Sequence, residues 1–143
     1  MTTSHSTVQP VGAVAARRPS GRAPIALRAA QLLLLVPLGA LLVAASIYFT
    51  FVDPPRAVQA VDWLVAAWAV AIGAGNLYVG LRLAGGTPVL QRAALVLVVN
   101  HLLFGIVKVA GYGEQESLTF IVIDLLALAL LLSPPVRRFF TRT

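Results

Sequence analysis

The sequence predicts an all-α, polytopic membrane protein: an up-down bundle of four transmembrane helices with both chain ends in the cytoplasm. Of its 143 residues 59% are hydrophobic and only 11% are charged, whereas soluble domains carry about 25% charged residues. Four apolar runs of spanning length account for the difference. Short turns separate these runs, and the positive charges gather on one side of them.

The first 26 residues form a basic tail that has almost no large hydrophobic side chain. Such a segment buries too little apolar surface to offset the entropy lost on ordering, so we expect a disordered cytoplasmic tail. The membrane domain then covers residues 27–134, with spans at about 29–50, 63–82, 89–110 and 117–133. Residues 135–143 are expected to form a basic interfacial tail.

The ends of the four spans follow from local chemistry. The first span contains no charge, and prolines at positions 54 and 55 end it because proline cannot continue a helix. A tight turn at 85–88, of sequence GGTP, makes the second and third spans antiparallel neighbours. A second short turn at 111–114, of sequence GYGE, does the same for the third and fourth. Prolines at 134 and 135 end the fourth span.

The charges predict how the helices are oriented. Nine of the eleven cations fall on one side of the four spans, which carries no acid: Arg17, Arg18, Arg22, Arg28, Arg82, Arg92, Arg137, Arg138 and Arg142. The other side holds Arg56 and Lys108 with Asp53, Asp62, Glu114 and Glu116. The positive-inside rule then places both termini in the cytoplasm.

Several function classes find no support in the sequence. The net charge of +6 follows from membrane topology, so we expect no nucleic-acid partner. There is no cysteine, which excludes disulfides and thiol chemistry. No nucleophile with its base, phosphate loop or dinucleotide motif is present, so we name no catalytic residue and no cofactor. One histidine and one aspartate in the spans fall short of the usual three or four metal ligands, and no metal site is expected.

Polar side chains inside the spans are the candidates for a site, because such groups are costly in lipid. Asn100 and His101 lie near the middle of the third span, and Asp124 lies in the middle of the fourth. His101 and Asp124 are equally far from the turn between Tyr112 and Gly113. At a rise of about 1.5 Å per residue both lie roughly 17 Å below that turn. We therefore expect the two side chains to contact each other near the bilayer midplane.

The remaining candidates concern the edges of this site and helix packing. Lys108 shares a helical stripe with His101 and Gly105, and is expected either to reach the headgroups or to meet Glu116. In the second span Gly73, Asn76 and Gly80 share one face. We expect the glycines Gly73, Gly80 and Gly105 to allow close helix packing, and Asn76 to make a hydrogen bond between helices.

The stretch LLALALLLSPPVRRFF, from Leu125 to Phe140, resembles the last helix and basic exit of small uncharacterised four-helix membrane proteins of actinobacteria. In size and architecture the chain is also similar to DoxX-like proteins. These resemblances imply a multi-pass protein of the bacterial cytoplasmic membrane. They supply no functional residues for this sequence.

The sequence supports two main interpretations of function. The first is a small non-enzymatic accessory or interaction subunit, in which the polar residues only fix helix packing. The alternative is a proton-coupled small-solute transporter or channel that uses His101 and Asp124. A membrane enzyme ranks third. Beyond the lipid bilayer, the expected partners are copies of the same chain or a larger membrane complex. A water-accessible cavity that reaches His101 would favour the transporter.

Overall fold

The structure is a computed structural model that describes residues 22–52 and 59–141, and the regular elements in both stretches are helices. The first stretch is one continuous rod formed by α1 (Ile25–Ala29), the π-helical η1 (Ala30–Leu35), α2 (Val36–Ile47) and the π-helical η2 (Tyr48–Val52). The second contains α3 (Ala60–Arg82), the 3-10 turn η3 (Leu83–Gly85), α4 (Pro88–Tyr112), α5 (Ser117–Leu132) and α6 (Pro134–Thr141). The all-α class is confirmed for the described residues.

Three helical segments are long and apolar enough to cross a membrane: Ile25–Val52, Ala60–Gly85 and Pro88–Tyr112. A fourth candidate is the pair α5 and α6, which meet at a bend of 53°. Alone, α5 has 16 residues, fewer than the about 20 that a bilayer requires. The described residues therefore contain three helices that are long and apolar enough to cross a membrane, or four if the bent pair counts as one span.

The predicted boundaries differ from the structure by a few residues. The first three predicted spans lie wholly inside the rod, α3 and α4, and the fourth ends one residue beyond α5. Most of the predicted N-terminal tail, residues 1–21, lies outside the described residues. Its last two residues are already helical, because α1 begins at Ile25.

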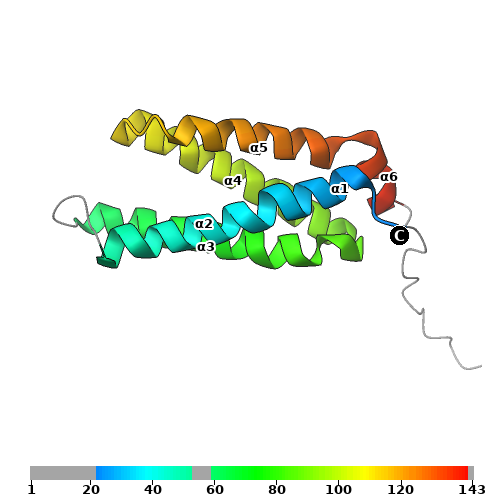
Figure 1. The fold of residues 1–143 in the computed structure, drawn as a ribbon, viewed down its shortest axis with the longest axis horizontal. Helices are drawn as coiled ribbons and strands as arrows, with labels where there is room; N and C mark the ends of the chain where they lie inside the picture. Colours follow the sequence, from blue (N-terminus) through cyan, green and yellow to red (C-terminus); the bar gives the residue numbers. More distant parts are fainter. Residues whose placement is uncertain (1–21, 53–58, 142–143) are drawn as a thin grey trace, which may run out of the picture.

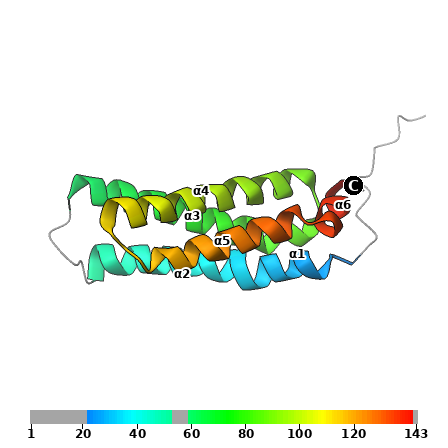
Figure 2. The ribbon, with the colours of Figure 1, turned by 90° about the horizontal axis from the view of Figure 1, so that it is seen from above.

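The helices form two pairs that run along the length of the molecule (Figures 1 and 2). The rod packs along α3, α4 packs along α5, and α3 also contacts α4. The start of α1 and the whole of α6 lie at one end, here called the α6 end. In Figure 1 the two pairs are close at the α6 end and diverge toward the opposite end, here called the Gly113 end after the turn between α4 and α5.

Both predicted turns contain a glycine in the left-handed region of the backbone. Gly86, which follows η3, has φ 73°, and Gly113, which follows α4, has φ 68°. Residues that carry a Cβ rarely adopt this backbone conformation, whereas glycine adopts it without strain. After Gly86 the Thr87 hydroxyl accepts a hydrogen bond from Leu90 N at 3.4 Å and so caps α4.

Glycines allow the rod and α3 to approach closely. A Cβ on Gly39 would lie 2.7 Å from the Gly73 carbonyl oxygen and 3.0 Å from Leu77 N. A Cβ on Gly80 would lie 3.0 Å from a methyl group of Val36. The glycine face of the second predicted span therefore packs against the first, and Gly39 contributes to this contact from the rod.

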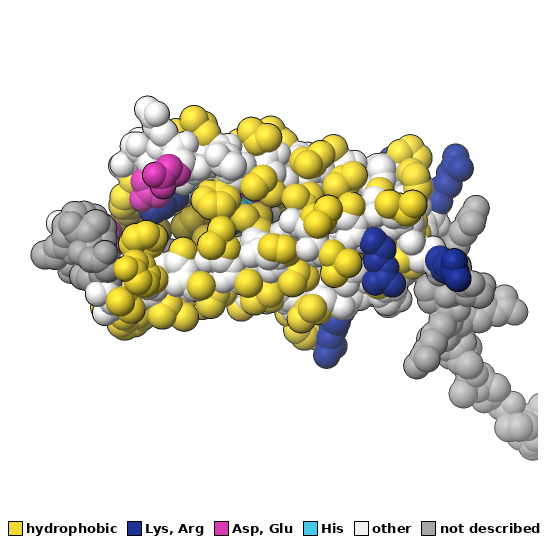
Figure 3. Space-filling model, viewed as in Figure 1, with side chains coloured by type: hydrophobic (Ala, Val, Ile, Leu, Met, Phe, Trp, Pro, Cys, Tyr) yellow, Lys and Arg dark blue, Asp and Glu magenta, His cyan; other side chains and the backbone are white. Residues whose placement is uncertain are grey.

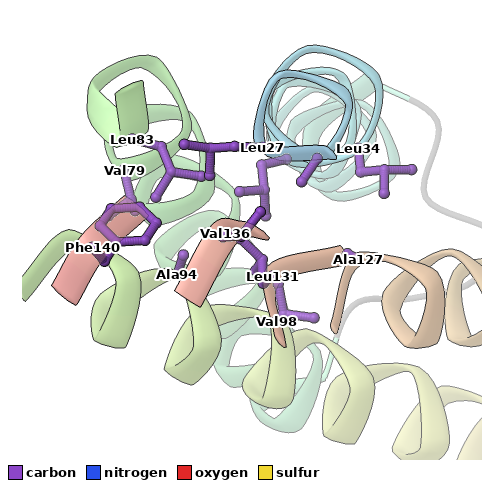
Figure 4. Close-up of a cluster of buried hydrophobic side chains, with 12 residues drawn as sticks. Leu27, Leu34, Val79, Leu83, Ala94, Val98, Ala127, Leu131, Val136 and Phe140 are labelled. Carbon is purple, nitrogen blue, oxygen red and sulfur yellow. The ribbon is translucent and has the colours of Figure 1, made fainter. Parts of the chain in front are cut away.

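The α6 end is filled by a large apolar cluster, part of which is seen in Figure 4. Its buried members come from the rod, α3, η3, α4, α5 and α6: Leu27, Ala30, Leu34, Leu35, Val79, Leu83, Ala94, Val98, Ala127, Leu131, Val136 and Phe140. Val136 and Phe140 stand four residues apart and so share one face of α6, while Arg137 and Arg138 are exposed. The predicted interfacial tail therefore also closes the core at this end.

Exposed large hydrophobic side chains occur on every long helix of the bundle, and on the face shown in Figure 3 they are spread along its length. Leu33, Leu64 and Val89, on three different helices, are each 72% exposed. A soluble monomer rarely exposes continuous apolar surface of this extent. In Figure 3 most of the basic side chains lie toward the α6 end, and the acidic ones lie at the Gly113 end beside a basic side chain. Together with the apolar helices of spanning length, this distribution suggests a membrane protein.

Candidate functional site

His101 and Asp124 form a buried pair between α4 and α5. His101 Nδ1 lies 2.8 Å from Asp124 Oδ1, and the two side chains are 2% and 1% exposed. The Gly113 turn places the two helices antiparallel, so residues equally far from the turn lie at the same depth. The contact expected from the sequence is therefore present.

Aromatic rings hold the imidazole of His101 in place. The Phe104 ring, on the same helix, is nearly parallel to it at a centroid distance of 6.3 Å and an angle of 12°. The Phe120 ring of α5 meets it edge-on at 6.2 Å. Asp124 Oδ2 is buried and has no hydrogen-bond partner among the described residues. The carboxylate is thus held through a single oxygen, by His101.

A cavity of about 540 Å³ opens between the two helix pairs toward the Gly113 end. Its hollow is visible in Figure 3, with acidic side chains at its edge. Most of its wall is apolar and comes from four sides of the bundle, with Leu38 and Phe49 of the rod, Val65 of α3, Phe104 of α4 and Phe120 of α5 among the lining residues. The cavity ends short of the apolar cluster that fills the α6 end.

His101 lies at the boundary between this cavity and Asp124. The His101 side chain belongs to the cavity lining, and Asp124 does not. Because Nδ1 faces Asp124, Nε2 is the ring nitrogen on the other side of the imidazole. A proton or a ligand that enters the cavity therefore meets His101 first and Asp124 only through it.

Charged residues line the mouth of the cavity. Lys108 Nζ forms an ion pair with the Glu114 carboxylate and lies 5.0 Å from the centre of the Tyr112 ring. The sequence offered two alternatives for Lys108, the headgroups or Glu116, and the carboxylate that it meets in the structure is that of Glu114 instead of Glu116. The turn at Gly113 brings Glu114 N to within 3.3 Å of the Lys108 carbonyl oxygen, which sets the Glu114 side chain beside that of Lys108.

Two further carboxylates lie at the mouth. Asp62 lines the cavity from α3, where its Oδ2 also accepts a hydrogen bond from Gln59 N at 2.8 Å and caps the helix. Glu116 lines it from the turn before α5 and is exposed. The lining at the mouth thus carries three carboxylates and one ammonium group.

The other predicted polar residues lie outside the pair. The Asn100 amide donates to the Val96 carbonyl oxygen of its own helix at 3.1 Å, and Asn100 does not line the cavity. Asn76 is 1% exposed, but neither polar atom of its side chain has a hydrogen-bond partner among the described residues. The predicted interhelical hydrogen bond of Asn76 is absent there, and its Cβ packs at the contact with Gly39.

The glycine at position 105 links the site to helix packing. A Cβ on Gly105 would lie 3.1 Å from Ile121 of α5, so glycine lets the two helices approach beside the pair. Gly105 also lines the cavity. Within the described ranges, no group of three or more histidine, cysteine or acidic residues could hold a metal ion.

Some residues of the site had no signal in the sequence. Phe104 and Phe120 look like ordinary lipid-facing or core residues in an apolar run, yet they flank the imidazole and line the cavity. Ser46, a small polar residue of the rod that lines the cavity, was likewise not singled out. Only the packing of four helices brings them together.

No family model matches this chain, and neither a curated protein nor a solved structure is significantly similar to it. Its function has to be inferred from its own residues.

Proposed function

We propose that this chain is a proton-coupled transporter of a small solute in the bacterial cytoplasmic membrane. In this proposal it spans the membrane four times, with α6 and both chain ends in the cytoplasm. The cavity then opens outward and serves as the outer half of the solute path. Support for the orientation comes from Arg28, Arg82, Arg137 and Arg138 near the α6 end and the acidic residues at the cavity mouth.

One observation carries the proposal: His101 both lines the cavity and contacts Asp124. An ionisable residue in the middle of a membrane is costly, and such residues commonly belong to ion paths and proton relays. A pair that served packing alone would gain nothing from a cavity that reaches it. Here the cavity gives protons from one side of the membrane access to the pair, while the apolar cluster at the α6 end blocks the other side.

An accessory or interaction subunit, which the sequence favoured, stays a prediction. It requires only that the pair stabilise the bundle, and the 2.8 Å contact is compatible with that role. We prefer a transporter to an accessory subunit because the cavity reaches His101. The experiments below separate the two functions.

A pair of adjacent alanines on α3 tests whether the cavity is wet and faces outward. Ala66 lines the cavity, whereas Ala67 is exposed on the outer surface of the bundle and does not line it. The chain has no cysteine of its own, so single-cysteine variants can be labelled without background. We expect a charged, membrane-impermeant thiol reagent added outside cells to modify Ala66→Cys and not Ala67→Cys, because thiolates form in water and not in lipid. Labelling of Ala66→Cys only from the cytoplasmic side would show that the cavity opens to the cytoplasm and that the proposed orientation is wrong.

Transport itself is tested in proteoliposomes with an imposed pH gradient. The panel of labelled solutes comprises small organic cations, neutral aromatic molecules and carboxylates. The wild type should accumulate at least one class when the gradient is present and none when it is collapsed. Asp124→Asn should remove the accumulation while keeping the folded protein, because the amide retains hydrogen-bonding capacity but carries no charge.

The control for this assay is Asn100→Ala, which changes a polar residue of α4 that does not line the cavity. It should transport like the wild type. Accumulation by neither the wild type nor the control, for any member of the panel, would count against a transporter and leave the accessory subunit. Accumulation that survives Asp124→Asn would remove the pair from the mechanism.

A further inference from the structure

The charge at the cavity mouth selects among solutes. Lys108 is paired with Glu114, and the exposed carboxylate of Glu116 adds a negative charge to the lining. Like charges repel and opposite charges attract over about 8 Å at physiological ionic strength. The mouth therefore concentrates cations and discourages anions before any solute reaches the floor.

The His101–Asp124 pair, which forms the floor of the cavity, also favours cations over anions, for a different reason. With one proton between His101 Nδ1 and Asp124 Oδ1 and a second on Nε2, the pair is neutral. Loss of the proton on Nε2 to the cavity leaves a net charge of −1. A net charge is costly in a region of low dielectric constant, so the deprotonated pair is stabilised by a cation placed in the cavity beside Nε2. The two protons and their affinities belong to the pair as a unit.

The walls indicate what the rest of the solute looks like. Leu38, Leu42 and Val65 line the cavity with aliphatic surface, and Phe49, Phe104 and Phe120 add aromatic rings. Aromatic faces attract organic cations as well as apolar groups. A volume of about 540 Å³ falls within the range of small-molecule sites, roughly 300–1,000 Å³. An inorganic ion would leave these walls unused.

We infer that the cavity binds a small organic cation with an apolar body, and that this cation and a proton compete for the His101–Asp124 pair. The inference rests on the proposed function and names its solute class and its coupling: each cation that binds displaces the proton held on Nε2 into the cavity. Either the bound cation or the proton on Nε2 then balances the negative charge of the His101–Asp124 pair.

Binding to full-length protein in nanodiscs tests the inference with two ligands of nearly the same shape. Benzyltrimethylammonium carries a fixed positive charge, and neopentylbenzene has carbon in place of its nitrogen. After subtraction of uptake by protein-free nanodiscs, we expect the cation to bind at least about tenfold more tightly, which corresponds to about 1.4 kcal/mol. Equal affinity for both ligands would show that the cavity is a plain apolar site, such as one for a lipid chain, and would overturn the inference.

The pH dependence of binding tests the competition in the wild type, with no variant required. Benzyltrimethylammonium cannot gain or lose a proton, so any dependence comes from the protein. If binding displaces one proton, its Kd should rise toward about tenfold per pH unit as the pair becomes protonated at lower pH. A Kd that does not change with pH would contradict the competition.

Other groups that face the cavity also titrate and need their own controls. They are Asp62 on α3, Lys108 and Tyr112 on α4, and Glu114 and Glu116 in the turn; the rod contributes none of the ionisable lining. Glu116→Gln should weaken binding in a salt-dependent way and keep the pH dependence. The double change His101→Leu with Asp124→Leu removes both titrating groups of the pair and should remove the pH dependence, and Asn100→Ala should change neither property. A pH dependence that disappears in Glu116→Gln would assign it to the mouth and overturn the inference.

Failure of this inference differs from failure of the proposed function. Proteoliposomes that accumulate neutral or anionic solutes, but not benzyltrimethylammonium, would leave a transporter and refute the cation. Binding of the cation in competition with protons, without accumulation of any solute, would uphold the inference about the site and refute transport.

Discussion

Asp124→Leu is expected to lower the free energy of unfolding by about 2–3 kcal/mol, because it leaves the buried His101 Nδ1 without its partner. Breaking a buried ion pair in a soluble protein costs about 3–5 kcal/mol, and hydrogen bonds between membrane helices are on average weaker. The value is expected between these two ranges, because both side chains are almost completely buried and His101 is left without its partner.

The double change His101→Leu with Asp124→Leu should recover part of this loss. Both partners are then apolar, and no stranded polar group remains. The coupling energy of the cycle is expected at about 0.5–2 kcal/mol. Asp124→Asn should cost less than Asp124→Leu, because the amide can still accept a hydrogen bond from His101.

Equilibrium unfolding in mixed micelles can measure this cycle through tryptophan fluorescence. Trp68 is a suitable reporter, since its ring meets that of Phe104 edge-on at 5.3 Å, and Phe104 in turn stacks on His101. If the costs of the two single changes simply add, the pair contributes no coupling, and its contact in the folded protein has no energetic consequence.

Phe140→Ala is expected to lower the free energy of unfolding by about 3 kcal/mol, the lower end of the range for removing a buried phenylalanine ring. Phe140 is 1% exposed and belongs to the apolar cluster at the α6 end, together with Val136 and Leu131. The lower end applies because the unfolded protein keeps apolar surroundings in detergent or lipid, so less is lost on unfolding than in water.

The neighbouring ring offers a matched control. Phe139 is only partly buried, and its ring meets that of Phe140 edge-on at 5.3 Å. Phe139→Ala removes that aromatic contact but little buried surface, so we expect a cost of about 1 kcal/mol. The same unfolding measurement compares the two variants. Equal costs would mean that α6 lies on the surface and does not close the α6 end.

Features that depend on distance along the chain were predictable from the sequence. Because a helix rises by a constant amount per residue, the Gly113 turn alone puts His101 and Asp124 at one depth. The second turn, with glycine at Gly86 and a capping Thr87, makes α3 and α4 antiparallel neighbours. Composition alone predicted apolar helices of spanning length, which the structure has.

Features that depend on the direction of a side chain around its helix needed the tertiary structure. The sequence offered Glu116 as the partner of Lys108, and the backbone turn at Gly113 selected Glu114 instead. Asn76 shares a face with two glycines, but the close approach at Gly39 leaves its side chain without a hydrogen-bond partner among the described residues. Local geometry of this kind follows from contacts between helices and not from spacing within one helix.

The sequence by itself determined the class of protein, the helices and the depth of the polar pair, because hydrophobicity, helical rise and turn chemistry act locally. Only the tertiary structure decided that α6 packs Phe140 into the core at one end and that a cavity reaches His101 from the other. Whether two helix pairs stay in contact or diverge depends on the sum of many weak packing contacts between residues far apart in the chain. It therefore cannot be predicted from any single stretch of the sequence.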